Sequence, residues 1–261
     1  MTDLFEPLLL GGLPVKNRIA LPPLVRFGWS DERGLVSDKH LRHYERIAKA
    51  GTGLIIVEAT CVAKGARLSD DQLGLWDDGQ VPGMRELASR CKAHGAVTLV
   101  QIHHGGFRRV AGSINELSIA DLVAIKDEFA SACRRAKDAG FDGVELHGAH
   151  GYLLSQFTNP LNNARTDEYG GDLDGRCRFP LEVVDAVAPL ASDHFILGYR
   201  MGCNLPDLDA AVWLARELIQ RGVDLLHVSN NGGGSPPVPE APAGFAHSDL
   251  VWCGSEIGRQ V

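Results

Sequence analysis

Short apolar segments alternate with longer amphipathic segments along most of this chain. Six segments have the length and the apolar, often β-branched, content of buried strands: residues 18–21, 53–60, 97–103, 141–146, 195–199 and 223–228. Apolar residues recur at helical spacing between them, at residues 37–51, 82–94, 118–139, 174–190 and 207–221. No hairpin signal joins successive strands, so the pattern predicts a parallel sheet whose strands are connected by helices.

Polar side chains follow the apolar part of one strand after another. Glu58, Gln101, Glu145, Arg200 and Ser229 each stand at or near the end of an expected strand. Contributions from so many strand ends meet most naturally at the mouth of a (β/α)8 TIM barrel. An open doubly wound sheet would gather its ligand groups at one switch point, and no G-x-G-x-x-G turn follows the first strand. The sequence therefore predicts an α/β fold of the TIM-barrel class.

The expected strands are two short of the eight that close such a barrel. We expect residues 4–19 to form a hairpin or plug, residues 258–261 to lie within the start of a further helix, and residues 1–261 to be one barrel domain without strands seven and eight. The sheet would then have two unpaired edges, which invite pairing or aggregation. Either segments of a longer chain are missing from this sequence, which a mass above 28.1 kDa would reveal, or a partner supplies them.

Charge and cysteine content exclude several classes of protein. The net charge is −7 and no dense cluster of Lys and Arg interrupts it, which disfavours binding to nucleic acid or to an anionic membrane. The six cysteines form no C-x-x-C pair, so neither a zinc knuckle nor an iron–sulfur cluster is indicated. Their spacing is typical of reduced thiols in a cytoplasmic protein. The longest apolar runs, such as residues 53–57, are too short to span a membrane.

Residues 141–179 hold the densest group of chemically versatile side chains. The strand is expected to stop at His147, and His150 and Tyr152 follow before a polar loop that ends near Asp174. The two histidines are candidates for buried structural residues, a metal pair or substrate ligands. No carboxylate or cysteine stands at metal-ligand spacing beside them, which disfavours a metal. Tyr152 is either a core residue or a proton donor.

Other polar residues allow structural interpretations. Gln101 and Arg200 would each be ordinary strand-end residues if taken singly, but their placement on strands three and five together favours a cofactor site. His103 and His104 are expected to pack the turn before residues 105–106. Two groups are expected outside the site: solvated charges at Asp70, Asp71, Asp77 and Asp78, and side chains that fix the long loop at Arg165, Asp167, Tyr169 and Arg176.

The chain resembles the old yellow enzyme family of flavin-dependent ene-reductases and NADH:flavin oxidoreductases. The most specific match is HGAHGYLLSQFTNPLNNARTDEYGG at residues 147–171. Supporting matches are KNRIALPP at 16–23, GLIIVEAT at 53–60, VQIHHGG at 100–106 and GVDLLHVS at 222–229. The resemblance implies a (β/α)8 barrel that holds FMN at its C-terminal mouth and takes hydride from NADH or NADPH.

The resemblance also assigns a cofactor site. Gln101 would hydrogen-bond the pyrimidine edge of the flavin, and the guanidinium of Arg200 would lie near N1 and C2=O, where it stabilises the anion of the reduced ring. The contacts to the isoalloxazine ring would come from Pro23, Leu24, Val25 and Ala59.

For the substrate, the resemblance implies an electron-poor alkene that carries a carbonyl or nitro group. His147 and His150 would bind its oxygen, Phe27 would contact it, and Tyr152 would donate a proton to carbon. Negative charge builds on that oxygen during hydride transfer, which is why two imidazole donors suit it. Such a protein would bind a small molecule and neither nucleic acid nor membrane, and a homo-oligomer is compatible with it.

Three features depart from the family pattern. Val25 occupies the place of a Thr or Cys that tunes the flavin potential, and only about a dozen residues join His104 to Ser118, where the family has a longer lid. The third departure is the absence of strands seven and eight, whose loops would hold the cofactor phosphate. Two alternatives therefore stay open: a non-catalytic or degenerate relative, and a flavin-free barrel that binds a phosphorylated metabolite.

Overall fold

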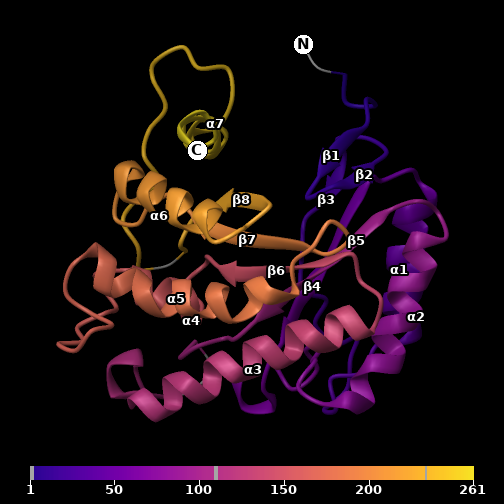
Figure 1. The fold of residues 1–261 in the computed structure, drawn as a ribbon, viewed down its shortest axis with the longest axis horizontal. Helices are drawn as coiled ribbons and strands as arrows, with labels where there is room; N and C mark the ends of the chain where they lie inside the picture. The colour runs from indigo at the N-terminus through magenta and orange to yellow at the C-terminus, as the bar shows by residue number, and fades with distance from the viewer. Residues whose placement is uncertain (1–2, 109–110, 233) are drawn as a thin grey trace.

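A computed structural model describes residues 3–108, 111–232 and 234–261 of the chain. Its centre is a curled sheet of six strands in the order β3-β4-β5-β6-β7-β8, each pair parallel (Figure 1). The strands are β3 Ala20–Leu21, β4 Leu54–Cys61, β5 Val97–His103, β6 Gly143–Gly148, β7 Ile196–Gly202 and β8 Leu225–Ser229. Strand order follows chain order, as expected of successive helical crossovers that all turn the same way.

Helices cover the convex side of this sheet. The α-helices are α1 Asp38–Lys49, α2 Val81–Lys92, α3 Ile119–Asp138, α4 Leu153–Thr158, α5 Leu173–Val187, α6 Leu208–Gln220 and α7 Asp249–Gln260. The 3-10 turns are η1 Lys64–Ala66, η2 Asp78–Gln80, η3 Ile114–Glu116 and η4 Ala188–Leu190. Several of the α-helices begin with a polar N-cap residue. The side chain of Ser118 accepts a hydrogen bond from the N–H of Asp121 at the start of α3, and that of Asp207 accepts one from the N–H of Ala210 at the start of α6.

The alternation of side chains along each strand produces two apolar layers. Residues such as Val57, Val100 and Leu197 point outward into the large core that the helices complete. Leu99 and Ile196 point inward and form a smaller cluster on the concave side. This arrangement is a partial (β/α)8 barrel, and the fold class predicted from the sequence is confirmed.

A short hairpin covers the amino-terminal end of the strands, as predicted for residues 4–19. Its strands, β1 Leu8–Leu10 and β2 Leu13–Val15, are antiparallel and turn at Gly11 and Gly12, whose φ angles are 52° and 83°. Val15 packs into the inner apolar cluster, and the turn lies against Asp224 and Asp193. The hairpin therefore plugs the end of the barrel opposite to the polar strand ends.

Four boundaries differ from the sequence-based expectations. β6 continues through His147 to Gly148, because the polar side chain faces the barrel interior and its backbone still pairs with β7. β3 has only two paired residues, and α4 forms inside the expected polar loop, where its side chains are buried. The helix expected around residues 258–261 is present but starts earlier, since α7 begins at Asp249 after its N-cap Ser248.

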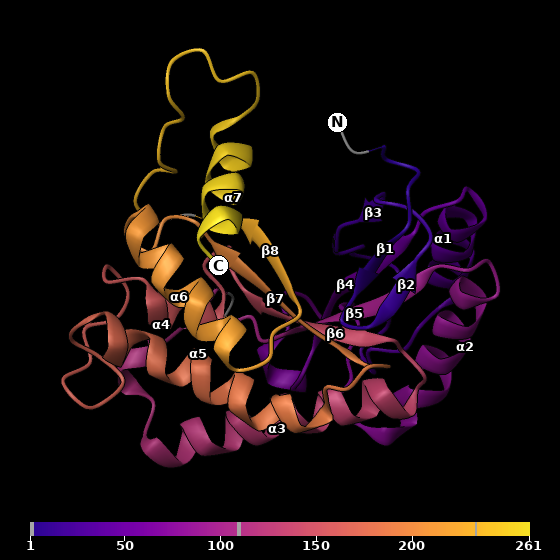
Figure 2. The same ribbon diagram turned by 45° about the horizontal axis from the view of Figure 1, so that its top comes forward.

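β3 and β8 are the two edges of the sheet, and within the described residues no other strand pairs with them. Figure 2 shows them at opposite ends of the open arc. A largely apolar cavity of about 360 Å³ lies between these edges, lined by Ala20 of β3, Leu54 and Ile56 of β4, and Leu225 and Val228 of β8. The prediction of two open edges is thus confirmed for the described part of the chain.

Asp70, Asp77 and Asp78 are exposed, as expected of solvated loop charges, whereas Asp71 is partly buried. These aspartates also bind neighbouring groups. Asp71 accepts a hydrogen bond from the N–H of Gly28, Asp77 caps η2 through the N–H of Gly79, and Asp78 pairs with Arg135 at 2.7 Å. The aspartates therefore connect loops at the carboxyl end of the sheet to each other and to α3. Arg165 fixes the long loop between α4 and α5, as predicted. Its guanidinium binds the carboxylate of Asp167 and the carbonyls of Ile114 and Leu117.

Replacement of Gly143 by alanine is expected to destabilise the fold. A Cβ at this β6 position would lie 2.3 Å from the backbone oxygen of Ile196, and backbone cannot move aside easily. Overpacking of this kind costs about 1–3 kcal/mol, which would lower the melting temperature by roughly 2–4 °C per kcal/mol. Gly254→Ala in α7 is the control, because its Cβ would meet only Val228 at 3.8 Å and alanine favours helix. Thermal unfolding of both variants measures the difference; equal effects would contradict the expectation.

Candidate active site

A cavity of about 250 Å³ opens at the carboxyl ends of the strands. Its lining consists of Pro23, Leu24, Val25, Phe27, Ala59, Leu68, Gln101, His147, His150, Tyr152 and Arg200. Ten of these residues are the ones that the sequence analysis proposed for cofactor, substrate or proton transfer, and only Leu68 is additional. The structure thus brings together all ten, which come from five separate segments of the chain, while their individual roles stay predictions.

Strand register explains why these side chains meet. Gln101 on β5 pairs with Glu145 on β6, and His147 on β6 pairs with Arg200 on β7, which in turn pairs with His227 on β8. Alternate residues of a strand face the same side, so Glu145 and His147 both point inward above the apolar inner cluster. The polar layer therefore lies directly on top of the packed interior of the barrel.

Glu58 fixes the loop that forms one wall of the cavity. It lies on β4, is 1% exposed, and its Oε2 accepts a hydrogen bond of 2.6 Å from the backbone N–H of Arg26. Its Oε1 accepts from the hydroxyl of Tyr44 at 3.2 Å, and burial raises the pKa of Glu58 to about 7. The loop held in this way carries Leu24 and Phe27, whose side chains are 61% and 55% exposed at the mouth of the cavity.

A buried carboxylate also orients the polar groups on the cavity floor. Glu145 has no exposed surface and accepts hydrogen bonds from Nε2 of Gln101 at 2.7 Å and from Nδ1 of His227 at 2.8 Å. Because the amide nitrogen of Gln101 is used for Glu145, its oxygen remains available to a ligand as an acceptor. In the sequence Glu145 was identified only as a strand-end residue. A carboxylate within an apolar strand was the signal that could have indicated its buried role.

Arg200 lies beside this carboxylate and has spare hydrogen-bonding capacity. Its Nη1 is 3.5 Å from the carbonyl oxygen of Pro23, at the outer limit of a hydrogen bond, and its buried Nε has no partner within the described residues. Burial lowers the pKa of Arg200, although the group stays charged because a guanidinium does not deprotonate in proteins. A buried cation with an unused donor favours an acceptor or anionic group on any ligand that enters the cavity.

Two imidazoles and a phenol also line the cavity. Nε2 of His147 is 2.8 Å from Nδ1 of His150, and the ring centroids of His147 and Tyr152 are 4.9 Å apart. His150 has a φ of 64°, an uncommon conformation for a residue other than glycine. It is held there by its N–H bond to the carbonyl of Asn230 and by Gly232, where a side chain would collide with the His150 backbone.

His103, the last residue of β5, and His104, which follows it, have different roles. His104 packs the turn as predicted, since its Nδ1 accepts from the N–H of Gly106. His103 does not: its side chain is fully buried, its Nδ1 is 3.1 Å from Nδ1 of His147, and its ring lies edge-on against Tyr152. Sequence reasoning missed His103 and, on β8, His227 as residues around the site. Ser229 of β8 was expected only as a strand-end residue.

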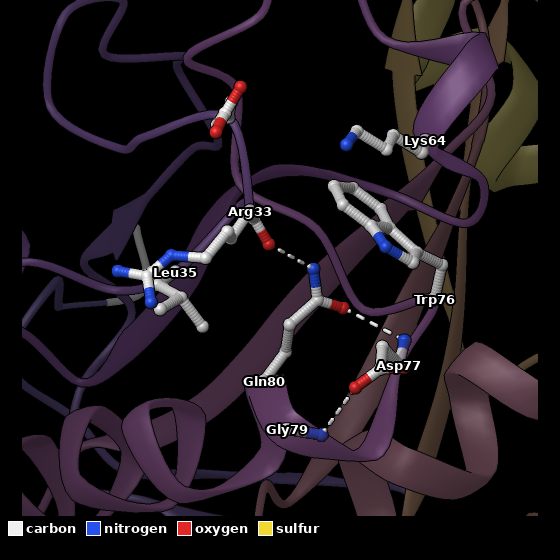
Figure 3. A pocket seen from close by; sticks show the side chains of 8 residues that line it. Arg33, Leu35, Lys64, Trp76, Asp77, Gly79 and Gln80 are labelled. Atoms are coloured by element: carbon white, nitrogen blue, oxygen red, sulfur yellow. Dashed lines mark hydrogen bonds between the residues drawn. The ribbon is translucent and has the colours of Figure 1, made fainter.

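A second cavity of about 330 Å³ lies beside Trp76 and is shown in Figure 3. Its polar groups satisfy one another: Gln80 donates to the carbonyl of Arg33 and accepts from the N–H of Asp77, and Asp77 in turn accepts from Gly79. Because those side chains are committed to holding loops together, this cavity is a weaker candidate than the one that contains Arg200 and the imidazoles.

Three further findings concern the described residues as a group. They contain no cluster of three or more His, Cys, Asp or Glu side chains placed to hold a metal ion. Within the same residues, none of the helices combines the length and the apolar character needed to cross a lipid bilayer. All six cysteines carry free, buried thiols, and burial raises the pKa of Cys61 to about 12.

Acid is expected to destabilise the protein through the buried imidazoles. Burial lowers the pKa of His103 to about 3 and that of His150 to about 4, below the ordinary value of 6.5. As the pH falls through 6.5 the unfolded chain therefore binds protons before the folded chain does, and stability falls. The loss should reach roughly 1 kcal/mol or more per imidazole at about pH 5, with no effect above pH 7.

Urea unfolding at a series of pH values measures this loss. The variant His150→Asn should reduce the slope of stability against pH. Asparagine is chosen because it tolerates the positive φ of this position. His247→Asn is the control, since His247 is exposed. An unchanged slope in His150→Asn would contradict the expectation.

Comparison with known proteins agrees with the geometry of the site. The model of the NADH:flavin oxidoreductase / NADH oxidase family matches residues 3–118 and 109–206. The NADPH dehydrogenase of Geobacillus sp. (strain WCH70) is 40% identical over 255 residues, which are 88% of this chain and 73% of that protein.

Two solved structures share the fold. Old Yellow Enzyme from Pichia sp. AKU4542 superimposes with a TM-score of 0.78 at 26% identity, over 87% of this chain and 71% of that chain. Morphinone reductase in complex with tetrahydroNAD gives a TM-score of 0.78 at 31% identity, over 87% and 74%. This chain therefore belongs to the NADH:flavin oxidoreductase / NADH oxidase family, the old yellow enzyme family, and is a flavin-dependent oxidoreductase with FMN as cofactor and NAD(P)H as hydride donor.

Proposed function

We propose that this enzyme reduces the activated C=C bond of α,β-unsaturated carbonyl or nitro compounds. The observation that carries the proposal is the convergence of Gln101, Arg200, His147, His150 and Tyr152 on one cavity at the carboxyl ends of the strands. Apolar side chains and a few fixed polar groups are what a site for a flat ring and a small neutral substrate requires.

The residues present fit FMN. The flavin pyrimidine edge combines an N–H donor with carbonyl and ring-nitrogen acceptors, which matches the free oxygen of Gln101 and the partnerless Nε of Arg200. Pro23, Leu24 and Ala59 supply apolar contacts on the same cavity. FMN, when bound, would accept hydride from NADH or NADPH and deliver it to the β-carbon of the alkene.

The remaining side chains would act on the substrate. The imidazoles of His147 and His150 would bind the carbonyl or nitro oxygen, on which negative charge builds, and would stabilise that charge in the manner of an oxyanion hole. Tyr152 borders the same cavity, with its ring 4.9 Å from that of His147. Its phenol would transfer a proton to the α-carbon by general acid catalysis.

Mixing experiments test the proposal directly. The FMN-loaded enzyme is reduced with NADPH without oxygen and then mixed with 2-cyclohexen-1-one. Recovery of oxidised flavin absorbance together with formation of cyclohexanone is expected. Saturated cyclohexanone as the mixing partner is the control and should leave the flavin reduced. A flavin that stays reduced with the enone as well would overturn the proposal while leaving FMN binding intact.

Replacement of Arg200 by leucine is expected to weaken FMN binding about 10- to 100-fold, because a hydrogen bond from a charged donor contributes roughly 1.5–3 kcal/mol. Quenching of FMN fluorescence by flavin-stripped protein gives the dissociation constant. Arg42→Leu removes an exposed guanidinium of α1 and is the matched control. Wild-type affinity in Arg200→Leu would exclude Arg200 from the cofactor site.

Replacement of Tyr152 by phenylalanine is expected to slow oxidation of the reduced enzyme by the enone at least about 100-fold, the usual effect of losing a general acid. Reduction of the flavin by NADPH should keep its rate, since that step needs no proton from the phenol. Stopped-flow absorbance separates the two steps. Tyr169→Phe is the control, because the Tyr169 hydroxyl binds Glu182 outside the cavity. Equal slowing of both steps would argue for a structural role.

A further inference from the structure

The carboxylate of Glu58 is buried behind one wall of the cavity and is surrounded by hydrogen-bond donors. Its Oε2 accepts from the backbone N–H of Arg26 at 2.6 Å, and its Oε1 accepts from the hydroxyl of Tyr44 at 3.2 Å. Nε2 of His40 lies 3.6 Å from the same Oε1. Because Nδ1 of His40 accepts from the N–H of Ser37, a neutral His40 ring carries its hydrogen on Nε2, toward Glu58.

A proton on Glu58 does not fit this arrangement. On Oε2 it would meet the N–H of Arg26, and on Oε1 it would meet the hydroxyl of Tyr44 and the N–H of His40. Tyr44 is held in place, because its oxygen also accepts from the backbone N–H of Glu58 at 2.9 Å. On either oxygen the proton would deprive a buried donor of its acceptor, which costs free energy. The observed arrangement therefore favours the ionised carboxylate.

Burial opposes the ionisation that this arrangement favours. Glu58 is 1% exposed, and burial raises its pKa to about 7, although the hydrogen bonds from Arg26 and Tyr44 lower it in part. Burial also lowers the pKa of His40 to about 4, so this ring is neutral around pH 7 and does not compensate the charge. Glu58 consequently gains or loses its proton close to neutral pH.

Few other charged groups face Glu58. The titratable and charged side chains packed against it are Arg26 from the loop and His40 and Tyr44 from α1, with His43 of α1 behind Arg26 at 3.5 Å. The neighbouring strand β3 has no titratable residue, and the one on β5, His103, bonds with His147 instead. The protonation of Glu58 is therefore tied to the loop that contains Arg26.

The N–H of Arg26 attaches this loop to the sheet. Four residues of segment 22–27 line the cavity: Pro23, Leu24, Val25 and Phe27. Within the described residues, the N–H of Arg26 is the only backbone donor of segment 22–27 that has a hydrogen-bond partner. Because Arg26 stands between Val25 and Phe27, its bond to Glu58 fixes both of these neighbours relative to β4.

We propose that Glu58 is a positioning residue for the cofactor cavity: its ionised carboxylate holds Val25 and Phe27 in place, and binding of FMN is coupled to loss of a proton from Glu58. Glu58 does not line the cavity, so the coupling acts through the N–H of Arg26. It is reciprocal, because a carboxylate that favours the bound state must itself be favoured by binding. The coupling concerns the cofactor and does not depend on the substrate that the reduced enzyme takes.

The direction of the effect follows from the protonation of Glu58. Above about pH 7 the carboxylate is ionised and holds the loop, whereas at lower pH the protonated carboxyl loses one of its donors. Affinity for FMN is therefore expected to rise with pH through about 7 and to level off above it. A hydrogen bond to a charged group is stronger than one to a neutral group by enough to change the affinity about fivefold.

Fluorescence titration of flavin-stripped protein between about pH 6 and pH 8 tests the proposal. The Kd for FMN should be about fivefold higher at the acid end. Riboflavin, which lacks the phosphate, should show the same change and so excludes titration of the FMN phosphate as its cause. Glu58→Gln cannot ionise, and we expect it to bind FMN weakly and equally at every pH. The same pH dependence in Glu58→Gln as in the wild type would overturn the proposal.

Carbon NMR of protein labelled with ¹³C at the glutamate carboxyls observes the proton itself. The Glu58 signal, identified by its absence in Glu58→Gln, should titrate near pH 7 in the flavin-stripped protein and at a lower pH once FMN is bound. A merely structural role would leave this titration unmoved by FMN. An identical titration with and without FMN would therefore contradict the coupling, even if Glu58→Gln weakened binding.

Tyr44→Phe removes a donor to Glu58 and leaves the bond to Arg26 in place. It should move the midpoint of the pH dependence of FMN binding upward, because the ionised carboxylate loses a partner. Tyr169→Phe is the control, since that hydroxyl binds Glu182. An unchanged midpoint in Tyr44→Phe would exclude Glu58 as the titrating group. Absence of enone turnover, combined with the expected pH dependence of FMN binding, would reject the proposed function and retain the coupling.

Discussion

The structure depends on the register of the parallel strands β5, β6, β7 and β8. Parallel pairing fixes which residues of neighbouring strands lie side by side, and the two-residue repeat of a strand fixes which of them face inward. Together these constraints place an inward layer of Leu99 and Ile196 below an inward layer that contains Gln101, Glu145 and Arg200. A shift of one residue in any strand would exchange the two faces and remove the polar layer.

A polar layer inside a barrel is stable only if its members satisfy one another, since an unpaired buried polar group costs free energy. Glu145 accepts hydrogen bonds from the side chains of Gln101 and His227, and Glu58 accepts one from the backbone N–H of Arg26 in the neighbouring loop. Two groups of residues that line the cavity keep unused hydrogen-bonding capacity: the oxygen of Gln101 and Nε of Arg200. The network that stabilises the barrel thus also determines which hydrogen-bonding groups of Gln101 and Arg200 are left for a ligand.

Much of the fold and of the site could be predicted from the sequence because local signals agree with the tertiary outcome. The apolar runs that became β4 and β5 and the polar caps of α3 and α6 identify their elements without knowledge of neighbours. The motif around His147, Gln101 and Arg200 identified residues that line one cavity. Helix α4 was missed because its residues are polar and apolar in no helical order, and burial against β6 and α5 decides its conformation.

The sequence by itself determined the parallel α/β architecture and the identity of the side chains at the strand ends, because alternation and residue type are properties of the chain alone. Only the tertiary structure decided which of those side chains are partners. His103 looked like a turn residue, yet the pairing of β5 with β6 places its ring against His147, 44 positions away. Hydrogen-bond partners across strands follow from register and burial, which no single segment encodes, and so the contact between His103 and His147 appears only once the barrel has folded.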